Sequence, residues 1–511
     1  MHAFQASSRE IPWAAAGPGV EAGDPQAALA KYADAVRQGT ADAADLANYG
    51  VLLCRFFQFR QADEVFRRAI EVGGLDAASL RRIAHCYFEI GRFSDAARVM
   101  RVAVARTADP DTVTVNTLAW TLERDHQVDE ARRYAEAACE MDPAYGPAVR
   151  LLAHLDRRAG DLERAERRLE DQLRRCPSEF DWGLRYELAA VQDRLGRYDA
   201  AWAALEAAKA QLAPQAARHL RDSQFIRRRQ WELVQLITFA DLRRWHEAGA
   251  RLHRKRIAFL AGFPRSGTTL LEQMIASRPD AIDTDESGIL ASQFVEPLVW
   301  RADDGLSAII ELRSLNVEQL SAGREAYYQM TESYLDEQIG DRLLIEKNPL
   351  FTADLALGVR LFPEAATLIA LRDPRDVVLS YLFTMVPLNW SSAPAMSVIE
   401  ACRFYADAMR HWLWWRRRLE DSACEVRYED LLADPAGATR CVAEFLGLEW
   451  DASMLDERYR SQRKAVRTPT YDDVTKPLYT RSVGRWRNYE HYLEPGLPLL
   501  KPFLEAFGYA D

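Results

Sequence analysis

A short stretch near the middle of the chain has the residue types of a phosphate-binding loop. Residues 262–269 read Gly-Phe-Pro-Arg-Ser-Gly-Thr-Thr, between the apolar run 257–261 and the helix-like run 270–277. The two glycines permit backbone conformations that turn several N–H groups inward, and the positive end of a following helix favours an anion there. The pattern predicts a strand, a loop and a helix that hold a phosphate. The candidate contacts are the cationic, hydroxyl and glycine residues of the loop: Arg265, Ser266, Gly267, Thr268 and Thr269.

This loop departs at one position from the phosphate loop of nucleotide hydrolases, G-x-x-x-x-G-K-[ST]. Thr268 stands at the lysine position, and the cation Arg265 lies inside the loop. Hydrolases and kinases use that lysine, together with magnesium, to neutralise the terminal phosphates of a nucleotide. A divergent P-loop NTPase or kinase is therefore the weaker alternative for this chain.

Two further apolar runs of the C-terminal half end at cationic residues. Lys347 follows the run 343–345, and Arg372 follows the run 367–371 and opens a string that ends at Ser380. In an open parallel sheet, ligands bind beyond the carboxyl ends of the strands. We therefore expect Lys347 and Arg372 to converge with the loop on one anion. Ser380 would lie less than two turns into the next helix, near enough to assist Arg372 with a second phosphate.

The N-terminal half repeats one pattern five times. A small or turn-tolerant residue is followed by an apolar residue two positions later and by alanine five positions later, and successive copies start 34, 35, 34 and 36 residues apart. This period matches the tetratricopeptide repeat, in which the first residue lies in the turn between two antiparallel helices. Residues 24–36 fit the second helix of an incomplete first copy. The first positions of the five copies are Phe57, Gly91, His126, Gly160 and Gly196.

Together these patterns predict an all-α part followed by an α/β part. Residues 24–212 form a tetratricopeptide helical solenoid, residues 213–256 an Arg-rich helical connector, and residues 257–511 an α/β domain with a parallel sheet. The concave groove of such a solenoid is a candidate binding surface for a partner protein. The array could equally support a dimer interface or stabilise its neighbour.

The overall composition excludes several classes of protein. The 66 Lys and Arg against 76 Asp and Glu give a net charge of −10, which opposes non-specific nucleic-acid binding. The seven cysteines form no Cys-x-x-Cys pair, which is typical of reduced thiols and disfavours a structural zinc site. No stretch approaches the roughly 20 apolar residues of a membrane span, and residues 1–20 lack the pattern of a signal peptide. We therefore expect a cytoplasmic protein with no nucleic-acid partner and no membrane span.

Two other segments of the C-terminal half bear on the site. The segment 383–394 is expected to form a loop over it, where acceptor contacts or gating would occur. The run 410–419, rich in Arg and Trp, could be a nucleic-acid element, but the acidity of the chain favours an amphipathic core helix with a solvated basic face.

From about residue 257 onward the chain resembles the sulfotransferase superfamily, whose members take a sulfuryl group from 3′-phosphoadenosine 5′-phosphosulfate. It is most similar to sulfotransferases fused to tetratricopeptide repeats and to protein-tyrosine sulfotransferases. The resemblance implies a P-loop-like α/β domain in which the loop holds the 5′-phosphosulfate, and it implies chemistry that needs no metal. Arg372 and Ser380 then match the pair that binds the 3′-phosphate. Tyr428 and Arg485, the latter at a place often filled by Lys, match positions near this co-substrate.

The same resemblance implies the catalytic roles. Glu286 stands where the tyrosine-type enzymes place their general base, whereas the small-molecule type uses a His, and the adjacent Asp285 is its rival. Lys347 matches the lysine that stabilises the bridging oxygen of the leaving group. Thr470 stands where relatives often have Ser, in a more loosely matched segment. Sulfuryl transfer, like phosphoryl transfer, is an in-line displacement governed by positioning and charge stabilisation.

The sequence thus predicts a sulfotransferase that acts on an acceptor hydroxyl. A peptide or protein tyrosine is the favoured acceptor, with a saccharide, a lipid or a small phenol left open. The alternative from another class is a tetratricopeptide scaffold with an inactive nucleotide-binding fold. Five residues with chemical roles in one domain argue against that alternative: Arg265, Glu286, Lys347, Arg372 and Ser380.

Overall fold

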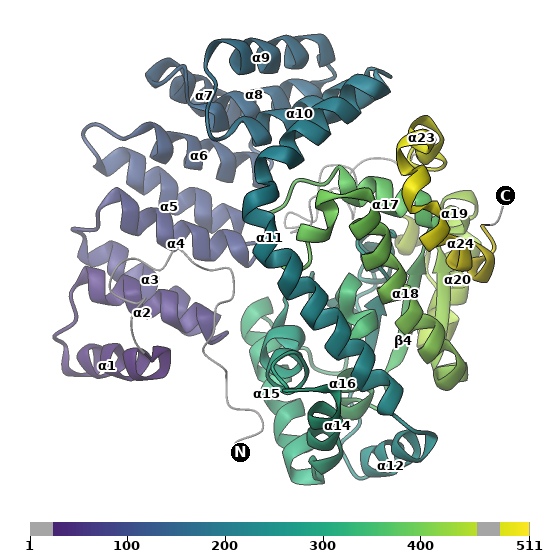
Figure 1. Cartoon of the computed structure of the whole chain (residues 1–511). Coiled ribbons are helices and arrows are strands. Elements are labelled where there is room, and N and C mark those ends of the chain that lie inside the picture. Colours follow the sequence, from purple (N-terminus) through teal and green to yellow (C-terminus); the bar gives the residue numbers. More distant parts are fainter. Residues whose placement is uncertain (1–23, 457–480, 510–511) are drawn as a thin grey trace. The chain divides into compact units, whose positions relative to one another are not determined.

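The computed structural model describes residues 24–456 and 481–509 (Figure 1). This part of the chain divides into two compact units, one ending at Pro214 and the other beginning at Gln215. The division falls inside the long helix α11 (Tyr198–Leu236), which contains Pro214. Each unit has its own apolar core.

The N-terminal unit is built from consecutive helices joined by short turns (Figure 1). Its helices are α1 (Pro25–Gln38), α2 (Ala43–Arg55), α3 (Phe59–Val72), α4 (Ala77–Glu89), α5 (Phe93–Arg106), α6 (Thr112–Arg124), α7 (Val128–Met141), α8 (Gly146–Ala159), α9 (Leu162–Arg175), α10 (Asp181–Arg194) and the first part of α11.

The turns of this unit lie at the predicted repeat positions. Every first position has a positive φ, which ends one helix and redirects the chain into the next. The φ values are 58° at Phe57, 75° at Gly91, 60° at His126, 87° at Gly160 and 73° at Gly196. The alanine five positions later is buried in every copy, where a larger side chain would separate the paired helices. The predicted tetratricopeptide-type solenoid is confirmed.

The C-terminal unit contains a five-stranded parallel sheet in the order β2-β3-β1-β4-β5. The first strand, β1, is central, and the chain adds β2 and β3 on one side of it before β4 and β5 on the other. The order therefore reverses next to β1, which is where ligands bind in open parallel sheets. The strands are β1 (Ile257–Ala261), β2 (Ala281–Asp283), β3 (Leu343–Lys347), β4 (Ala366–Leu371) and β5 (Ala423–Arg427).

Helices surround this sheet (Figure 1). They are the second part of α11, α12 (Phe239–Gly249), α13 (Thr268–Ile275), the π-helix η2 (Ala291–Trp300), α14 (Gly305–Ser314), α15 (Val317–Leu335), the 3₁₀ helix η3 (Pro349–Ala353), α16 (Leu355–Leu361), α17 (Pro374–Leu382), η4 (Ala393–Met396), α18 (Val398–Leu419), η5 (Glu420–Ser422), α19 (Tyr428–Ala433), α20 (Pro435–Leu446), η6 (Ala452–Leu455), η7 (Arg485–Tyr489), α23 (Glu490–Leu493), η8 (Glu494–Gly496) and α24 (Leu497–Phe507).

Both faces of the sheet are covered, as the buried strands β1 and β3 require. On one face, Leu260 of β1 belongs to a core with Met274 of α13 and Val442 of α20. On the other face, the ring of Phe259 lies 5.0 Å from that of Phe351. The predicted α/β domain with a parallel sheet is confirmed. None of the described helices combines the length and the apolar composition that a bilayer crossing requires.

A buried carboxyl holds the second part of α11 on this unit. Asp354 accepts hydrogen bonds from Gln230 Nε2 of α11 at 2.9 Å and from Trp300 Nε1 of η2 at 3.2 Å. Burial raises the pKa of Asp354 to about 7, although both hydrogen bonds act to lower it. The folded unit therefore favours the protonated carboxyl up to about neutral pH.

We predict that the Asp354→Asn variant gains stability relative to wild type as the pH rises from 5 to 7.5. A carboxyl whose pKa is raised on folding stabilises the fold below its unfolded pKa, near 3.8, and this contribution is lost as the pH rises toward 7. Each pKa unit corresponds to about 1.4 kcal/mol. The difference in Tm between variant and wild type across this pH range measures the effect, with Asp303→Asn, an exposed carboxyl of the same unit, as control. A difference that is independent of pH would contradict the prediction.

Candidate active site

The candidate site lies at the carboxyl edge of the sheet, where β1 is followed by the phosphate-type loop. Gly262, with φ 151°, donates its N–H to Thr352 Oγ1 at 2.9 Å. A Cβ at this position would lie 2.5 Å from the carbonyl oxygen of Ala370, so the loop can leave β1 here only with glycine. Glycine thus lets the loop pass beside the end of β4.

Two residues with positive φ shape the rest of the loop, Arg265 at 79° and Gly267 at 95°. The helix α13 starts immediately afterwards, and the first N–H groups of a helix have no partner within it. A Cβ on Gly267 would lie 2.6 Å from the ring of Tyr428, which means that this ring packs directly on the loop backbone. The hydroxyl residues Ser266, Thr268 and Thr269 are buried around the turn.

The structure brings Arg265, Arg372 and Ser380 together. Arg265 Nε donates to Ser380 Oγ at 2.9 Å, and Arg372 Nη1 donates to the carbonyl oxygen of Arg265 at 3.1 Å. Arg372 Nε is buried and has no hydrogen-bond partner among the described residues. Arg265 of the loop, Arg372 just after β4 and Ser380 of α17 therefore lie together, and Ser380 is hydrogen-bonded to Arg265 rather than to Arg372.

Residues 482–486 complete this side of the site. The Arg372 guanidinium lies 5.0 Å from the centre of the Tyr428 ring, and Tyr428 Oη is 3.1 Å from Ser482 Oγ. Asp376 of α17 accepts the N–H groups of Gly484 at 2.6 Å and Trp486 at 2.8 Å.

The same segment carries Arg485, whose guanidinium stacks 4.6 Å from the ring centre of Phe383. Phe383 opens the segment predicted to lie over the site, so Arg485 contacts that segment directly. Thr470 lies outside the described residues.

On the other side of the loop, Lys347 is completely buried at the end of β3. Its Nζ lies 2.6 Å from Glu272 Oε2, 3.3 Å from Asp285 Oδ1 and 3.3 Å from Glu286 Oε1. It also lies 3.5 Å from Thr269 Oγ1 of the loop. Burial acts to lower the pKa of Lys347, but the surrounding carboxylates outweigh it and hold the pKa above its ordinary value. The ammonium therefore stays charged.

The backbone that presents the acidic pair is strained. Asp285 and Glu286 follow β2 with φ 41° and 59°, a conformation that costs energy for residues with a Cβ. Such strain persists where the surrounding structure requires it, and it concentrates at functional sites. Here it turns both carboxylates toward Lys347, while a third of the Glu286 side chain remains exposed.

Sequence reasoning missed Glu272 and Asp376. Glu272 lies on α13, among apolar residues, and is 1% exposed. Thr268 and Thr269 share its helix face, so no local pattern marked this carboxylate as buried and paired. Asp376 lies in the first turn of α17, where an acidic residue is normally favoured by the helix dipole. Its position therefore did not indicate that it contacts residues 484–486.

Comparisons with known proteins found matches to sulfotransferases in this part of the chain. Residues 258–452 match the Sulfotransferase family. The chain resembles Protein-tyrosine sulfotransferase 1 from Danio rerio, with 22% identity over 50% of this chain and 72% of that protein. It also resembles Protein-tyrosine sulfotransferase 2 from Gallus gallus, with 24% identity over 45% of this chain and 62% of that protein.

A further sequence relative and a solved structure are also similar to this chain. An uncharacterized protein from Aquifex aeolicus is 27% identical over 48% of this chain, which spans only 32% of that protein. Among solved structures, sulfotransferase STF9 from Mycobacterium avium matches with a TM-score of 0.32 and 14% identity, covering 57% of this chain and 84% of that one.

We predict that Glu272→Gln destabilises the C-terminal unit by about 3 kcal/mol, because removing one partner of a buried ion pair weakens the compensation of the other charge. In a Lys347→Met background, where no buried ammonium remains, the same change should cost much less. Denaturant unfolding of the four proteins gives the double-mutant cycle. An equal cost of Glu272→Gln in both backgrounds would show that Glu272 does not act through Lys347.

Proposed function

We propose that the chain moves a sulfuryl group from 3′-phosphoadenosine 5′-phosphosulfate to the hydroxyl of an acceptor. The observation that carries this proposal is the arrangement around the loop. Arg265, Arg372 and Ser380 form a cationic and hydroxyl cluster on one side, and Lys347 with Glu286 lies at the other. The sulfotransferase-family match over the same residues supports it.

The residues of the site fit a doubly anchored nucleotide. Arg372 Nε is a buried donor without a partner among the described residues, and an anion beside it would use that hydrogen-bonding capacity. Arg265 and Gly267 hold the loop in a left-handed turn at the N-terminus of α13, which favours phosphate. When bound, 3′-phosphoadenosine 5′-phosphosulfate supplies an activated sulfuryl group. Within the described ranges, no cluster of His, Cys, Asp and Glu could hold a metal ion.

The chain's own residues divide the catalytic work. Glu286 takes the proton of the acceptor hydroxyl, since it is the more exposed of the two acidic residues beside Lys347. Lys347 meets negative charge on the leaving oxygen with an ammonium that is fixed before reaction, so little reorganisation is needed. Protonation of Glu286 weakens its attraction to Lys347 and leaves the ammonium better able to serve the leaving group.

A peptide or protein tyrosine is the proposed acceptor. The named animal relatives are protein-tyrosine sulfotransferases. The proposed base is a glutamate, which the resemblance described above associates with the tyrosine type rather than the small-molecule type. The tetratricopeptide unit offers a surface on which a protein substrate or partner could be recruited.

We predict that 3′-phosphoadenosine 5′-phosphate raises the Tm of the full chain in the presence of EDTA. Saturation at about 100 times Kd stabilises a folded protein by about 2.7 kcal/mol, which is several degrees. Arg265→Ala combined with Arg372→Ala should abolish the shift, whereas Arg251→Ala, an exposed arginine of the same unit, should retain it. Equal stabilisation by ATP with magnesium would instead support the NTPase alternative.

We further predict that Glu286→Gln retains the thermal shift but loses about 10² to 10⁴ in turnover, the usual contribution of a positioned base. The assay is transfer of labelled sulfate to tyrosine peptides and to a cell lysate, which also reports the class of acceptor. Asp285→Asn is the matched control and should lose less, because its carboxylate serves Lys347 but not the acceptor. Undiminished turnover of Glu286→Gln would place the base elsewhere.

A further inference from the structure

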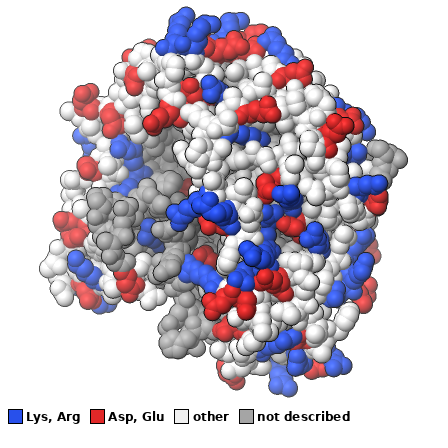
Figure 2. Space-filling model, viewed as in Figure 1, with Lys and Arg blue, Asp and Glu red and all other residues white. Residues whose placement is uncertain are grey.

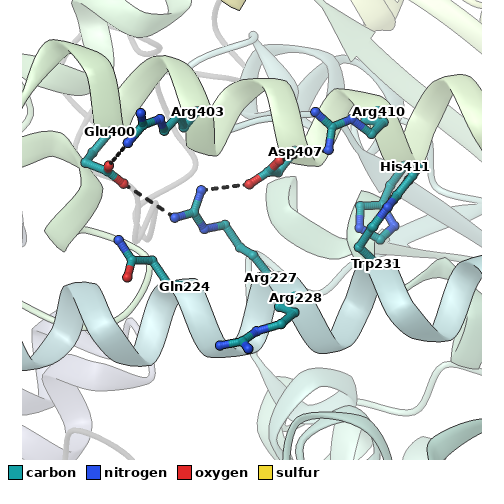
Figure 3. A pocket seen from close by; sticks show the side chains of 9 residues that line it. All are labelled: Gln224, Arg227, Arg228, Trp231, Glu400, Arg403, Asp407, Arg410 and His411. Atoms are coloured by element: carbon teal, nitrogen blue, oxygen red, sulfur yellow. Dashed lines mark hydrogen bonds and ion pairs between the residues drawn. The ribbon is translucent and has the colours of Figure 1, made fainter. Parts of the chain in front are cut away.

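A pocket outside the candidate active site lies between α11 and α18 in the C-terminal unit (Figure 3). Its volume of about 320 Å³ is within the range of small-molecule sites. The side chains that line it come from both helices. They are Gln224, Arg227, Arg228 and Trp231 from α11, and Glu400, Arg403, Asp407, Arg410 and His411 from α18.

This pocket uses a different face of α18 from the one that supports the phosphate-type loop. The rings of Phe404 and Tyr405 lie 5.3 and 5.2 Å from that of Phe263 in the loop. The pocket residues of α18 recur at helical spacing on another face, and Arg227 contacts Phe404 from that side at 5.6 Å. The pocket therefore lies on a face of α18 other than the one that packs on the loop, and no residue of the loop lines it.

Cationic groups outnumber carboxylates in the pocket. Arg227, which is almost buried, reaches Asp407 at 2.8 Å and Glu400 at 3.6 Å. The same two carboxylates also pair with Arg403 at 2.7 Å and Arg410 at 3.3 Å. Two negative charges are thus shared among three guanidinium groups.

The fourth guanidinium, that of Arg228, is exposed and makes no ion pair with any described residue. With four arginines against two carboxylates, the lining carries a net charge of +2 when His411 is neutral. Figure 2 shows blue and red side chains interleaved over this part of the C-terminal unit.

His411 carries a buried polar atom that the ion pairs of the pocket do not satisfy. It is buried and lies edge-on to Trp231, with ring centres 5.2 Å apart at 87°. Burial, assisted by the adjacent charge of Arg410, lowers the pKa of His411 to about 3, so the imidazole is neutral. Its Nδ1 has no hydrogen-bond partner among the described residues. A buried polar atom left without a partner in a pocket wall points to a missing water or ligand.

A purely structural role accounts for only part of the lining. Arg227 bridges α11 to α18 through its ion pairs with Glu400 and Asp407. Arg228 and Arg403 are mostly exposed and add positive charge at the opening, while the perpendicular rings of Trp231 and His411 provide aromatic surface. Charge at the opening beside aromatic surface suits a ligand with an anionic group and a ring.

We propose that this pocket binds a small phosphate monoester with a flat ring. A phosphate monoester carries close to two negative charges at neutral pH, which matches the excess of two guanidinium groups. A sulfate monoester carries only one. The phosphate binds among the guanidinium groups at the opening, and the ring lies beside Trp231, whose ring centre is 5.3 Å from the Arg410 guanidinium. The site is independent of the sulfuryl-transfer proposal.

Phenyl phosphate is the probe, titrated calorimetrically into the full chain at pH 7.5 in a phosphate-free buffer. Arg228→Ala with Arg403→Ala should weaken its binding at least about tenfold, since charge-assisted hydrogen bonds are the strong ones. Arg417→Ala, an exposed arginine of α18 outside the pocket, should leave it unchanged. Because the phosphate-type loop is a second anion site, Arg265→Ala serves to identify its signal, and it should not remove the component that the pocket variants remove.

Two further ligands test the chemistry of the proposal. Phenyl sulfate should bind more weakly than phenyl phosphate because it carries one charge, and inorganic phosphate should bind more weakly because it has no ring. The Tm of each variant in buffer alone verifies that it is folded. Unchanged affinity in the folded double variant, or equal binding of phenyl sulfate, would overturn the proposal and leave the arginines as an ion-pair network only.

Discussion

An ammonium group inside the protein, away from water, is the interaction on which the rest of the site depends. Lys347 is completely buried, and its charge persists only because Glu272, Asp285 and Glu286 surround it. These carboxylates come from the helix after the loop and from the segment after β2. Compensation of one charge therefore ties β2, β3 and α13 into a single geometry, and the strained backbone of Asp285 and Glu286 is part of its cost.

On the opposite side of the loop, hydrogen bonds to the backbone orient Arg372 and the segment 482–486. Arg372 donates to the carbonyl oxygens of Arg265 and Ser482, and Asp376 fixes the Gly484 and Trp486 amides. These contacts orient the guanidinium group without neutralising it, so its charge remains available to an anion. The two sides of the loop thus differ: acidic side chains surround the cation on one side, and backbone carbonyl groups hold Arg372 on the other.

Much of the solenoid and of the sheet could be predicted from short-range sequence patterns. The repeat turns needed residues that tolerate positive φ, and even Phe57 and His126 occupy that conformation because the repeat spacing requires it. The loop and the strand-end cations followed from the fact that parallel strands present their carboxyl ends together. The run 410–419 was interpreted correctly as amphipathic, since Trp412 and Trp415 are buried while its arginines lie toward the surface.

What escaped prediction depends on partners distant in the sequence. Glu272 and Lys347 are 75 positions apart, and their pairing arises only when α13 packs beside β3. The same holds for the pocket between α11 and α18, because residues near 227 were assigned to a connector and nothing local related them to residues near 407. Side chains that act across elements need the fold before their roles can be inferred.

The contact between Asp376 and the backbone of residues 484–486 also bears on how the protein matures during synthesis. Chains emerge from the ribosome with the N-terminal end first, so the solenoid and most of the sheet are available to fold well before these residues. Arg372 cannot acquire its contact with Ser482 until that late segment leaves the exit tunnel. The nascent chain would therefore carry a nearly finished sheet with an unfinished anion pocket, and translation itself would set the earliest moment at which the site could work.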